Sequence, residues 1–187
     1  MGVFARPQYQ MICMNLAATY LESAIKRVEA HRELSERAMS QLNDEDFYYR
    51  PNPQSNNIAI IIQHLSGNMI SRWTNFLTED GEKPGRSRDV EFQDQHYSRQ
   101  QLMEMWNAGW DCFLSSLQSL KEEDLLKTIY IRTEPLIVID AINRQLAHYP
   151  NHAGQMIYIA KMIKGGQWKS LSIPIGGSEE FNKKMRM

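Results

Sequence analysis

Residues 58–73, IAIIIQHLSGNMISRW, are the stretch that decides the fold. Their apolar side chains fall on nearly every side of a helix, which is typical of the most buried helix of a domain. Ser55 or Asn56 can cap the first turn, and we expect the helix to continue to about Leu77. His64 lies inside this apolar run, and a buried histidine needs a polar partner.

Three other segments have the three- and four-residue apolar spacing of amphipathic helices. The first covers residues 14–42. The next begins at a capping box formed by Ser98 and Gln101, and its apolar stripe reaches Leu120. The last has Pro135 in its first turn and ends at Gly165-Gly166.

The remaining segments are connections. Residues 128–132, TIYIR, are β-rich and are expected to form an extended link, and the tail from residue 167 has no helical period. The charged, turn-rich stretch at 79–89 belongs to a connection of about 20 residues, which is long enough for a crossover and of a length that is often functional. The sequence therefore predicts an all-α fold, a four-helix bundle with a long crossover loop, in a single domain over residues 1–187.

Composition excludes several classes of function. The formal net charge is -1 and the charges are interspersed, which argues against a nucleic-acid-binding face. No apolar run approaches the ~18–20 residues that span a bilayer, and the first residues lack the apolar segment of a signal peptide. Cys13 and Cys112 are isolated thiols without a CxxC motif. We expect a cytoplasmic protein with no nucleic-acid or membrane partner.

The histidines carry the chemical signal. His148 and His152 are four residues apart, so a helix places both on one face. His64 from a facing helix would complete a three-nitrogen metal site with open coordination positions. By itself the HxxxH pair is weak, since the sequence HYPNH lacks the glutamate of a metalloprotease HExxH motif. The alternative is that His64 is a core histidine bonded to Asn68, one turn away.

We expect structural roles for the other two histidines and for two tryptophans, and a local effect on the backbone from one proline. His31 lies at the edge of the apolar stripe of its helix, and His96 lies in a polar loop, where we expect it to be solvated. Trp106 and Trp110 are expected in the core. Pro150, between the two paired histidines, removes a backbone hydrogen bond and is expected to kink or interrupt the helix there.

Four segments carry a resemblance that covers nearly the whole chain. They are SNNIAIIIQHLSGNMISRWTNFLTEDGEK (55–83), RSRDVEF (86–92), AINRQLAHYPNHAGQMIYIAK (141–161) and WKSLSIPIGGSEEFN (168–182). In these segments the chain resembles the DinB/YfiT-like metalloenzymes. The resemblance implies a divalent metal, zinc or nickel, on His64, His148 and His152, and a homodimer. The chain departs from the family at Pro150-Asn151, where Tyr, Ala or His is usual, and at Gly85, where a large aromatic is expected.

Three hypotheses of function follow. The resemblance favours a thiol-dependent, bacillithiol-type S-transferase whose partners are a low-molecular-weight thiol and a small electrophile. Asn68, Arg72, Arg144 and Gln155 are then the candidates to bind a carboxylate of the thiol or to polarise the acceptor. A surface or interhelical salt bridge is an equally good interpretation of both arginines. The second hypothesis is a metal-dependent hydrolase, which is disfavoured because no acidic residue falls on the histidine faces and Asp140 is two turns from the pair. The third is a non-enzymatic, stress-linked dimeric bundle with a structural metal.

Overall fold

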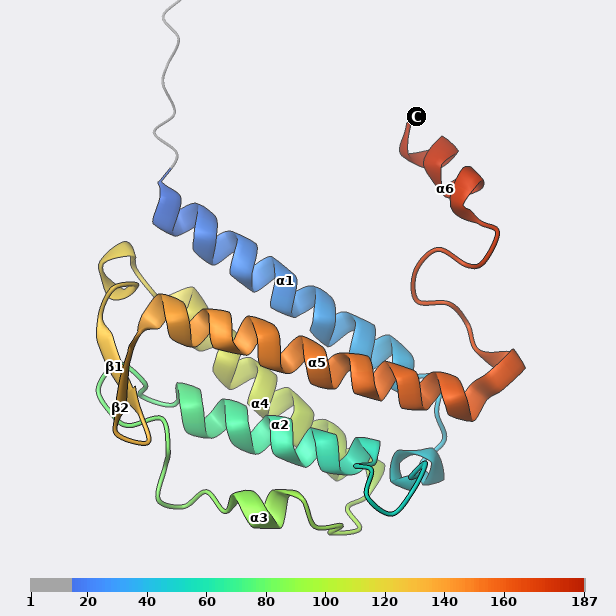
Figure 1. The fold of residues 1–187 in the computed structure, drawn as a ribbon, viewed down its shortest axis with the longest axis horizontal. Helices are drawn as coiled ribbons and strands as arrows, with labels where there is room; N and C mark the ends of the chain where they lie inside the picture. The colour runs from blue at the N-terminus through green and yellow to red at the C-terminus, as the bar shows by residue number, and fades with distance from the viewer. Residues whose placement is uncertain (1–14, 187) are drawn as a thin grey trace, which may run out of the picture.

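A computed structural model describes residues 15–186, and these are mostly helical (Figure 1). The predicted all-α class is therefore confirmed. Within the described range the long helices are α1 (Leu16–Met39), α2 (Ile58–Trp73), α4 (Arg99–Ser119) and α5 (Val138–Lys164). The shorter elements are the helices α3 (Arg88–Glu91) and α6 (Ser178–Met185), the strands β1 (Thr128–Ile131) and β2 (Glu134–Ile137), and 3-10 turns at Glu45–Tyr48, Glu122–Asp124 and Gly165–Gln167.

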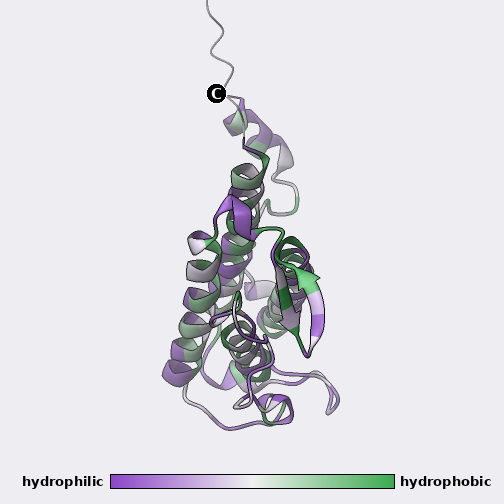
Figure 2. Ribbon diagram, turned by 90° about the vertical axis from the view of Figure 1, so that its left-hand side faces the viewer, coloured by the Kyte–Doolittle hydropathy of each residue, from purple (hydrophilic) through white to green (hydrophobic). Residues whose placement is uncertain are grey.

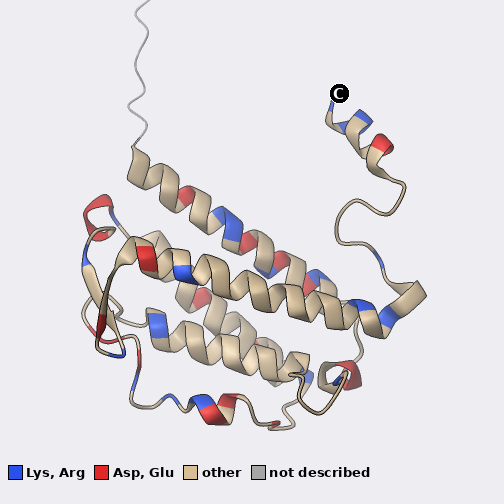
Figure 3. Cartoon of the chain, viewed as in Figure 1, with Lys and Arg blue, Asp and Glu red and all other residues tan. Residues whose placement is uncertain are grey.

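The helix α2 is buried along almost its whole length, as its apolar composition predicts. Figure 3 shows that the charge on α2 is confined to its C-terminal end. The cap is Asn57, which follows the predicted Ser55 or Asn56 by two residues or one, and its side chain accepts a hydrogen bond from the backbone N–H of Ile60 at 2.8 Å.

The long helices pack as two pairs, α2 on α4 and α1 on α5 (Figure 1). Gly109 allows a close approach in the first pair, because a Cβ at this position would lie 2.8 Å from the Cα of Ser66. The Ser66 hydroxyl also donates to the carbonyl of Met105 at 2.7 Å. Trp106 and Trp110 are fully buried, so their predicted place in the core is confirmed.

Two helix ends differ from the sequence prediction. The helix α2 ends at Trp73 and not near Leu77, because Thr74 is extended and Asn75 has a φ of 50°. The helix α1 ends at Met39, three residues before the predicted end. The capping box of α4 is confirmed, with Ser98 and Gln101 each bonding the backbone of the other.

The fourth helix begins later than predicted. Pro135 lies in β2, opposite Tyr130 of β1 in an antiparallel hairpin, and α5 starts only at Val138. A proline is tolerated there because both strands of a two-stranded sheet are edge strands, where a missing N–H costs little. The β-rich segment 128–132 is therefore one arm of this hairpin and not a simple link.

The hairpin is fastened to the loop that follows α2. The backbone N–H of Gly81 donates to the carbonyl of Tyr130 at 2.8 Å. The carboxylate of Asp80 accepts hydrogen bonds from the backbone N–H groups of Arg132 and Thr133 at 2.9 and 2.7 Å. The long connection after α2 is thus held against the segment that leads into α5.

The tail also differs from its prediction, because residues 178–185 form the exposed helix α6. Its apolar content is low, but Glu179–Lys183 and Glu180–Lys184 ion pairs connect successive turns at 3.2 and 2.8 Å. Pairs of this spacing stabilise a helix by about 0.2–0.5 kcal/mol each. The apolar pattern of the sequence did not predict this helix, because the contacts that stabilise it are polar.

The surface and the core separate along the amphipathic helices, whose residues alternate between hydrophilic and hydrophobic in Figure 2. Within residues 15–186, no helix has an apolar stretch of the length needed to cross a bilayer. Cys112 is a free, half-buried thiol, and Cys13 lies outside the described residues.

Candidate metal centre

The fold brings His64 of α2 against His148 and His152 of α5. The Nε2 atom of His148 lies 3.3 Å from Nε2 of His64 and 3.2 Å from Nε2 of His152. One ligand nitrogen from each of the three residues lies within 4.8 Å of the others. His64 is buried and the other two are half-buried. These three side chains can therefore hold a metal ion between them.

The opposite ring nitrogen of each histidine faces an oxygen. Nδ1 of His64 lies 3.0 Å from Oε2 of Glu91, and Nδ1 of His152 lies 3.0 Å from Oε1 of Gln155. Nδ1 of His148 lies 3.3 Å from Oε1 of Gln145. An N–H at each Nδ1 satisfies these oxygens and leaves the lone pair of each Nε2 facing the common centre.

This donor set fits a divalent cation. Three lone pairs that face one another have no hydrogen to share, so a positive ion is the partner that satisfies them together. In a tetrahedral zinc site with bonds of about 2.05 Å, neighbouring ligand nitrogens lie roughly 3.3 Å apart. The two short distances of His148 match this value. Three protein ligands also leave a position for a substrate, as catalytic sites require.

Electrostatics keep the histidine pair neutral. Burial, together with the neighbouring His152 and His64, lowers the pKa of His148 from 6.5 to about 4. Arg144 and Arg86 add to this effect through their positive charge. Burial and His64 also lower the pKa of His152, although the hydrogen bond that its Nδ1 donates to Gln155 acts in the opposite direction. Neutral imidazole is the form that binds metals, so the pair is prepared for an ion at neutral pH.

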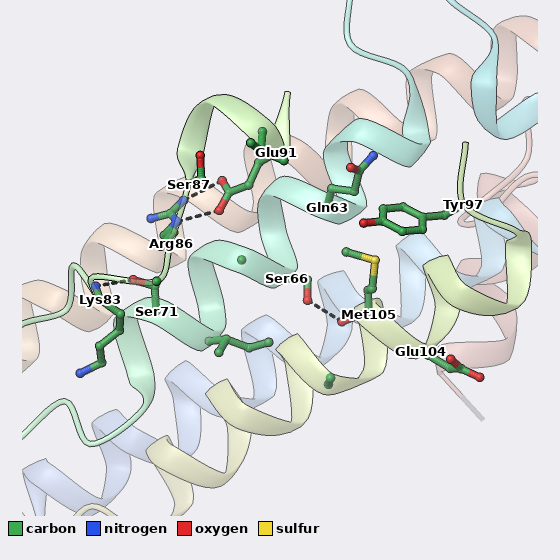
Figure 4. Close-up of a pocket in the computed structure, with 15 residues that line it drawn as sticks. Gln63, Ser66, Ser71, Lys83, Arg86, Ser87, Glu91, Tyr97, Glu104 and Met105 are labelled. Atoms are coloured by element: carbon green, nitrogen blue, oxygen red, sulfur yellow. Dashed lines mark hydrogen bonds and ion pairs between the residues drawn. The ribbon is translucent and has the colours of Figure 1, made fainter. Parts of the chain in front are cut away.

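Glu91 is a site residue that the sequence did not reveal. Arg86 donates to both of its carboxylate oxygens, at 2.7 and 2.9 Å (Figure 4). Burial would raise the pKa of Glu91, but the hydrogen bonds from Arg86 and His64 outweigh it and lower the pKa. Glu91 is therefore an ionised acceptor, and it fixes the proton of His64 on Nδ1. The sequence prediction concerned only the helix faces that carry the histidines, and it did not anticipate Glu91 because this carboxylate comes from α3.

Glycine at position 67 makes room for this carboxylate. A Cβ on Gly67 would overlap Oε1 of Glu91 and lie 2.9 Å from its Cδ. Gly67 follows His64 by three residues on α2, so the two residues share the face that α3 covers. A glycine one turn after the histidine was the one sequence signal for Glu91, but it does not identify the residue that fills the space.

The histidines line a cavity of about 430 Å³. Its lining also contains Asn68, Gln145, Phe92 and five arginines, namely Arg72, Arg86, Arg88, Arg132 and Arg144. Within residues 15–186 no carboxylate is part of the lining. The cavity therefore combines a place for a cation with a positively charged wall.

The four residues predicted to act beside the histidines have different surroundings. Asn68 lines the cavity and accepts a hydrogen bond from the Tyr149 hydroxyl at 3.1 Å, so it does not bond to His64 as the alternative interpretation expected. Arg72 is buried and bonded to Gly81 and Glu82, which fits the salt-bridge interpretation. Arg144 is exposed and lines the cavity. Gln155 faces His152 and not the cavity.

Residues 15–177 match a family described as proteins of unknown function, DUF1572. The chain belongs to the DUF1572 family. No protein of established function matches the chain closely enough to count as a relative. The matched range contains all three histidines, Glu91 and the glutamines that bond to the histidine rings, so it includes the whole centre described above.

Pro150 does not interrupt the helix in this DUF1572 protein. The helix α5 is continuous over Val138–Lys164 with Pro150 inside it, and His148 and His152 still converge. His96 is solvated, as predicted, with 86% of its side chain exposed. His31 is half-buried on α1, which agrees with its predicted place at the edge of the apolar stripe.

Arg86 and Glu91 also line a larger hollow of about 710 Å³, which Figure 4 shows. It is lined mainly by apolar atoms, and no histidine is among the described residues around it. Gly85 is one of its lining residues, and a Cβ there would meet nothing within 4 Å. The space beside Gly85 is therefore open in this DUF1572 protein.

Proposed function

We propose that this DUF1572 protein is a metal-dependent S-transferase that joins a low-molecular-weight thiol to a small electrophile. We assign its helices to a DinB/YfiT-like four-helix bundle with a long crossover between α2 and α4, as the resemblance implies. The observation that carries the proposal is the convergence of three histidine Nε2 atoms in a cavity, with an acceptor on each Nδ1.

Zinc or nickel is the ion that we propose for His64, His148 and His152, because imidazole suits both metals. When bound, such an ion supplies the positive charge that keeps a coordinating thiol in its nucleophilic thiolate form. The chain's own contribution is geometry. Glu91 and Gln155 orient two of the rings, and buried Gln145 orients the third.

The cavity wall would orient the substrates. Asn68 is held by Tyr149 and presents its amide to the cavity that contains the histidines. Arg144 lies exposed on the same wall. Fixing two reactants in one geometry is the main rate effect available to such a site, because a second-order encounter becomes a reaction within one complex.

A hydrolase is less well supported. Hydrolysis at a metal site needs a free general base, and the carboxylate that the fold brings to the histidines is Glu91. Both of its oxygens are engaged by Arg86, and one also accepts from His64. A carboxylate held in this way with a lowered pKa is a poor proton acceptor.

The first test is metal content per chain by mass spectrometry. We expect about one zinc or nickel ion per wild-type chain after reloading, and a loss of that ion in His64→Ala and in His148→Ala. His96→Ala is the matched control, because His96 is exposed and its ion-pair partner is Asp94 and not a residue of the centre. Wild-type protein that binds no ion after reloading would remove the basis of the proposal.

The second test is conjugation of thiols by the metal-loaded protein. Glutathione, cysteine and bacillithiol are each mixed with 1-chloro-2,4-dinitrobenzene. In the reaction the sulfur–carbon bond forms and the carbon–chlorine bond breaks, chloride leaves with the bonding pair and the thiol proton passes to water. We expect a rate above that of His148→Ala with at least one thiol. An ion that binds without any such rate would favour the non-enzymatic dimer with a structural metal.

A further inference from the structure

The positive wall of the histidine cavity is only partly neutralised. Arg72 and Arg132 share the carboxylate of Glu82, at 2.8 and 3.0 Å. Arg86 is paired with Glu91. Two carboxylates therefore serve three of the five arginines around the cavity, and neither carboxylate is itself a lining residue.

Arg88 and Arg144 have no acidic partner among residues 15–186. Both are exposed and both line the cavity. The guanidinium of Arg88 stacks on the ring of Phe92 at 4.8 Å, a contact that fixes its plane and leaves its N–H edges available. Phe92 in turn packs on His64, with ring centroids 4.8 Å apart, so Arg88 is held beside the candidate metal centre.

Arg86 supplies a third, buried positive charge. Its side chain is 5% exposed, and its Nη1 atom has no hydrogen-bond partner among the described residues. Nη1 lies 4.0 Å from a carboxylate oxygen of Glu82, which is beyond hydrogen-bond distance. A buried guanidinium nitrogen without an acceptor is costly, and a ligand oxygen in the cavity would relieve that cost.

We propose that Arg88 and Arg144, backed by Arg86, form a subsite for the carboxylate or phosphate group of a small molecule whose reacting atom lies at the three histidines. The planar fork of arginine matches both anions. A cavity of about 430 Å³ accepts a molecule of metabolite size. As a statement about the transferase substrate this rests on the proposed function, but anion binding is measurable without the metal.

The test is calorimetric titration of the metal-free full-length protein with succinate and, separately, with inorganic phosphate at low salt. Succinamide is the neutral analogue of succinate. The variants are Arg144→Gln and Arg88→Gln, and Arg27→Gln is the matched control because Arg27 is an exposed arginine on α1 that lines none of the described cavities. Circular dichroism and metal content after reloading verify that each variant keeps its fold and its histidine centre.

We expect at least one of the two anions to bind more tightly than about 1 mM. Arg144→Gln and Arg88→Gln should each weaken binding about 10-fold, as expected for the loss of one charge-assisted contact. Arg27→Gln should bind as wild type does, and succinamide should not bind. The anion that binds more tightly identifies the chemical class of the substrate group.

The subsite is wrong if neither anion binds, if succinamide binds as well as succinate, or if the two variants bind as Arg27→Gln does. Its failure and that of the transferase are separable. Anion binding that depends on Arg144 and Arg88 in a protein without conjugating activity supports the subsite and counts against the transferase. Conjugation that is unchanged in both variants, with no anion binding, supports the transferase and counts against the subsite.

Discussion

Glu91 is the side chain on which the orientation of the His64 ring depends, and its replacement is a direct test. Glu91→Gln keeps the shape but removes the charge that accepts from His64 and pairs with Arg86. We expect metal affinity to fall about 10- to 100-fold, since loss of a partner behind a ligating histidine has effects of this size. The measurement is competition with a chromophoric chelator.

Glu79→Gln is the control for that substitution. Glu79 is an exposed carboxylate of the same connection between α2 and α4 and pairs with Lys83 at 2.7 Å, without a contact to the histidines. Its replacement should leave the metal affinity unchanged. Equal affinities of Glu91→Gln and Glu79→Gln would mean that Glu91 has no part in the centre.

The histidine pair makes the metal-free protein sensitive to acid. The pKa of His148 is about 4 in the folded protein against about 6.5 in the unfolded chain, and that of His152 is also lowered. Between these values the unfolded chain binds more protons, so the free energy of unfolding decreases as pH falls from about 6.5 to about 4. Urea midpoints across this range should decrease less in His148→Gln than in wild type. Parallel curves for the two proteins would contradict the assignment.

At the scale of the helix, the contact between α2 and α3 depends on Gly67. Gly67→Ala places a methyl group where the Glu91 carboxylate lies. Because the carboxylate ends a flexible side chain, we expect it to move away from His64 while the helices stay in place. Metal affinity should therefore fall as in Glu91→Gln. The urea midpoint should change little, because alanine favours a helix over glycine by about 1 kcal/mol and this gain offsets the loss of the Glu91 contacts.

Gly154→Ala provides the matched helical control. Gly154 lies in α5 two residues after His152, and a Cβ there would meet nothing within 4 Å. It should gain up to about 1 kcal/mol in free energy of unfolding with unchanged metal affinity. If Gly67→Ala behaved as Gly154→Ala does, the close packing of Glu91 on α2 would be refuted.

The helices were predictable because their apolar periods are local, as the stripe that contains Trp106 and Trp110 shows. The hairpin was not, because Pro135 is acceptable both in the first turn of a helix and in an edge strand. The choice between them is made by Asp80 and Gly81, which bond to the hairpin from a loop about 50 residues earlier. The residues that surround Pro135 in the sequence do not indicate this long-range contact.

The residues of the candidate site likewise differ in whether the sequence could predict their positions. His148 and His152 are placed together by one helix, so their spacing was sufficient to predict them as neighbours. Glu91 lies 27 residues after His64 and meets it only because α3 folds back on α2. The roles of Arg72 and Arg144 were equally undecided, since the choice between a salt bridge and an open side chain depends on Glu82, which the loop brings to Arg72 and not to Arg144.

For the whole molecule, the histidines join the α2–α4 pair to the α1–α5 pair. An ion that binds only the folded protein adds about 2.7 kcal/mol at 100 times its dissociation constant, which raises Tm by roughly 5–10 °C for a chain of this size. Chelation should reverse this shift in wild type. In His148→Ala the chelator should have no effect on Tm, and a wild-type Tm that is indifferent to metal would count against the centre.

His64 and His148 are 84 residues apart, which has a consequence for the order of synthesis. On the ribosome, α2 is complete long before α5 exists. Until α5 emerges, His64 is the one imidazole of this set with which the nascent chain could bind an ion. Two of the three ligands belong to the last long helix, so a chain that stops before it retains the apolar helix α2 and has no centre. Metal loading would then mark chains whose translation has passed residue 152, and a chelatable ion would distinguish finished molecules from truncated ones.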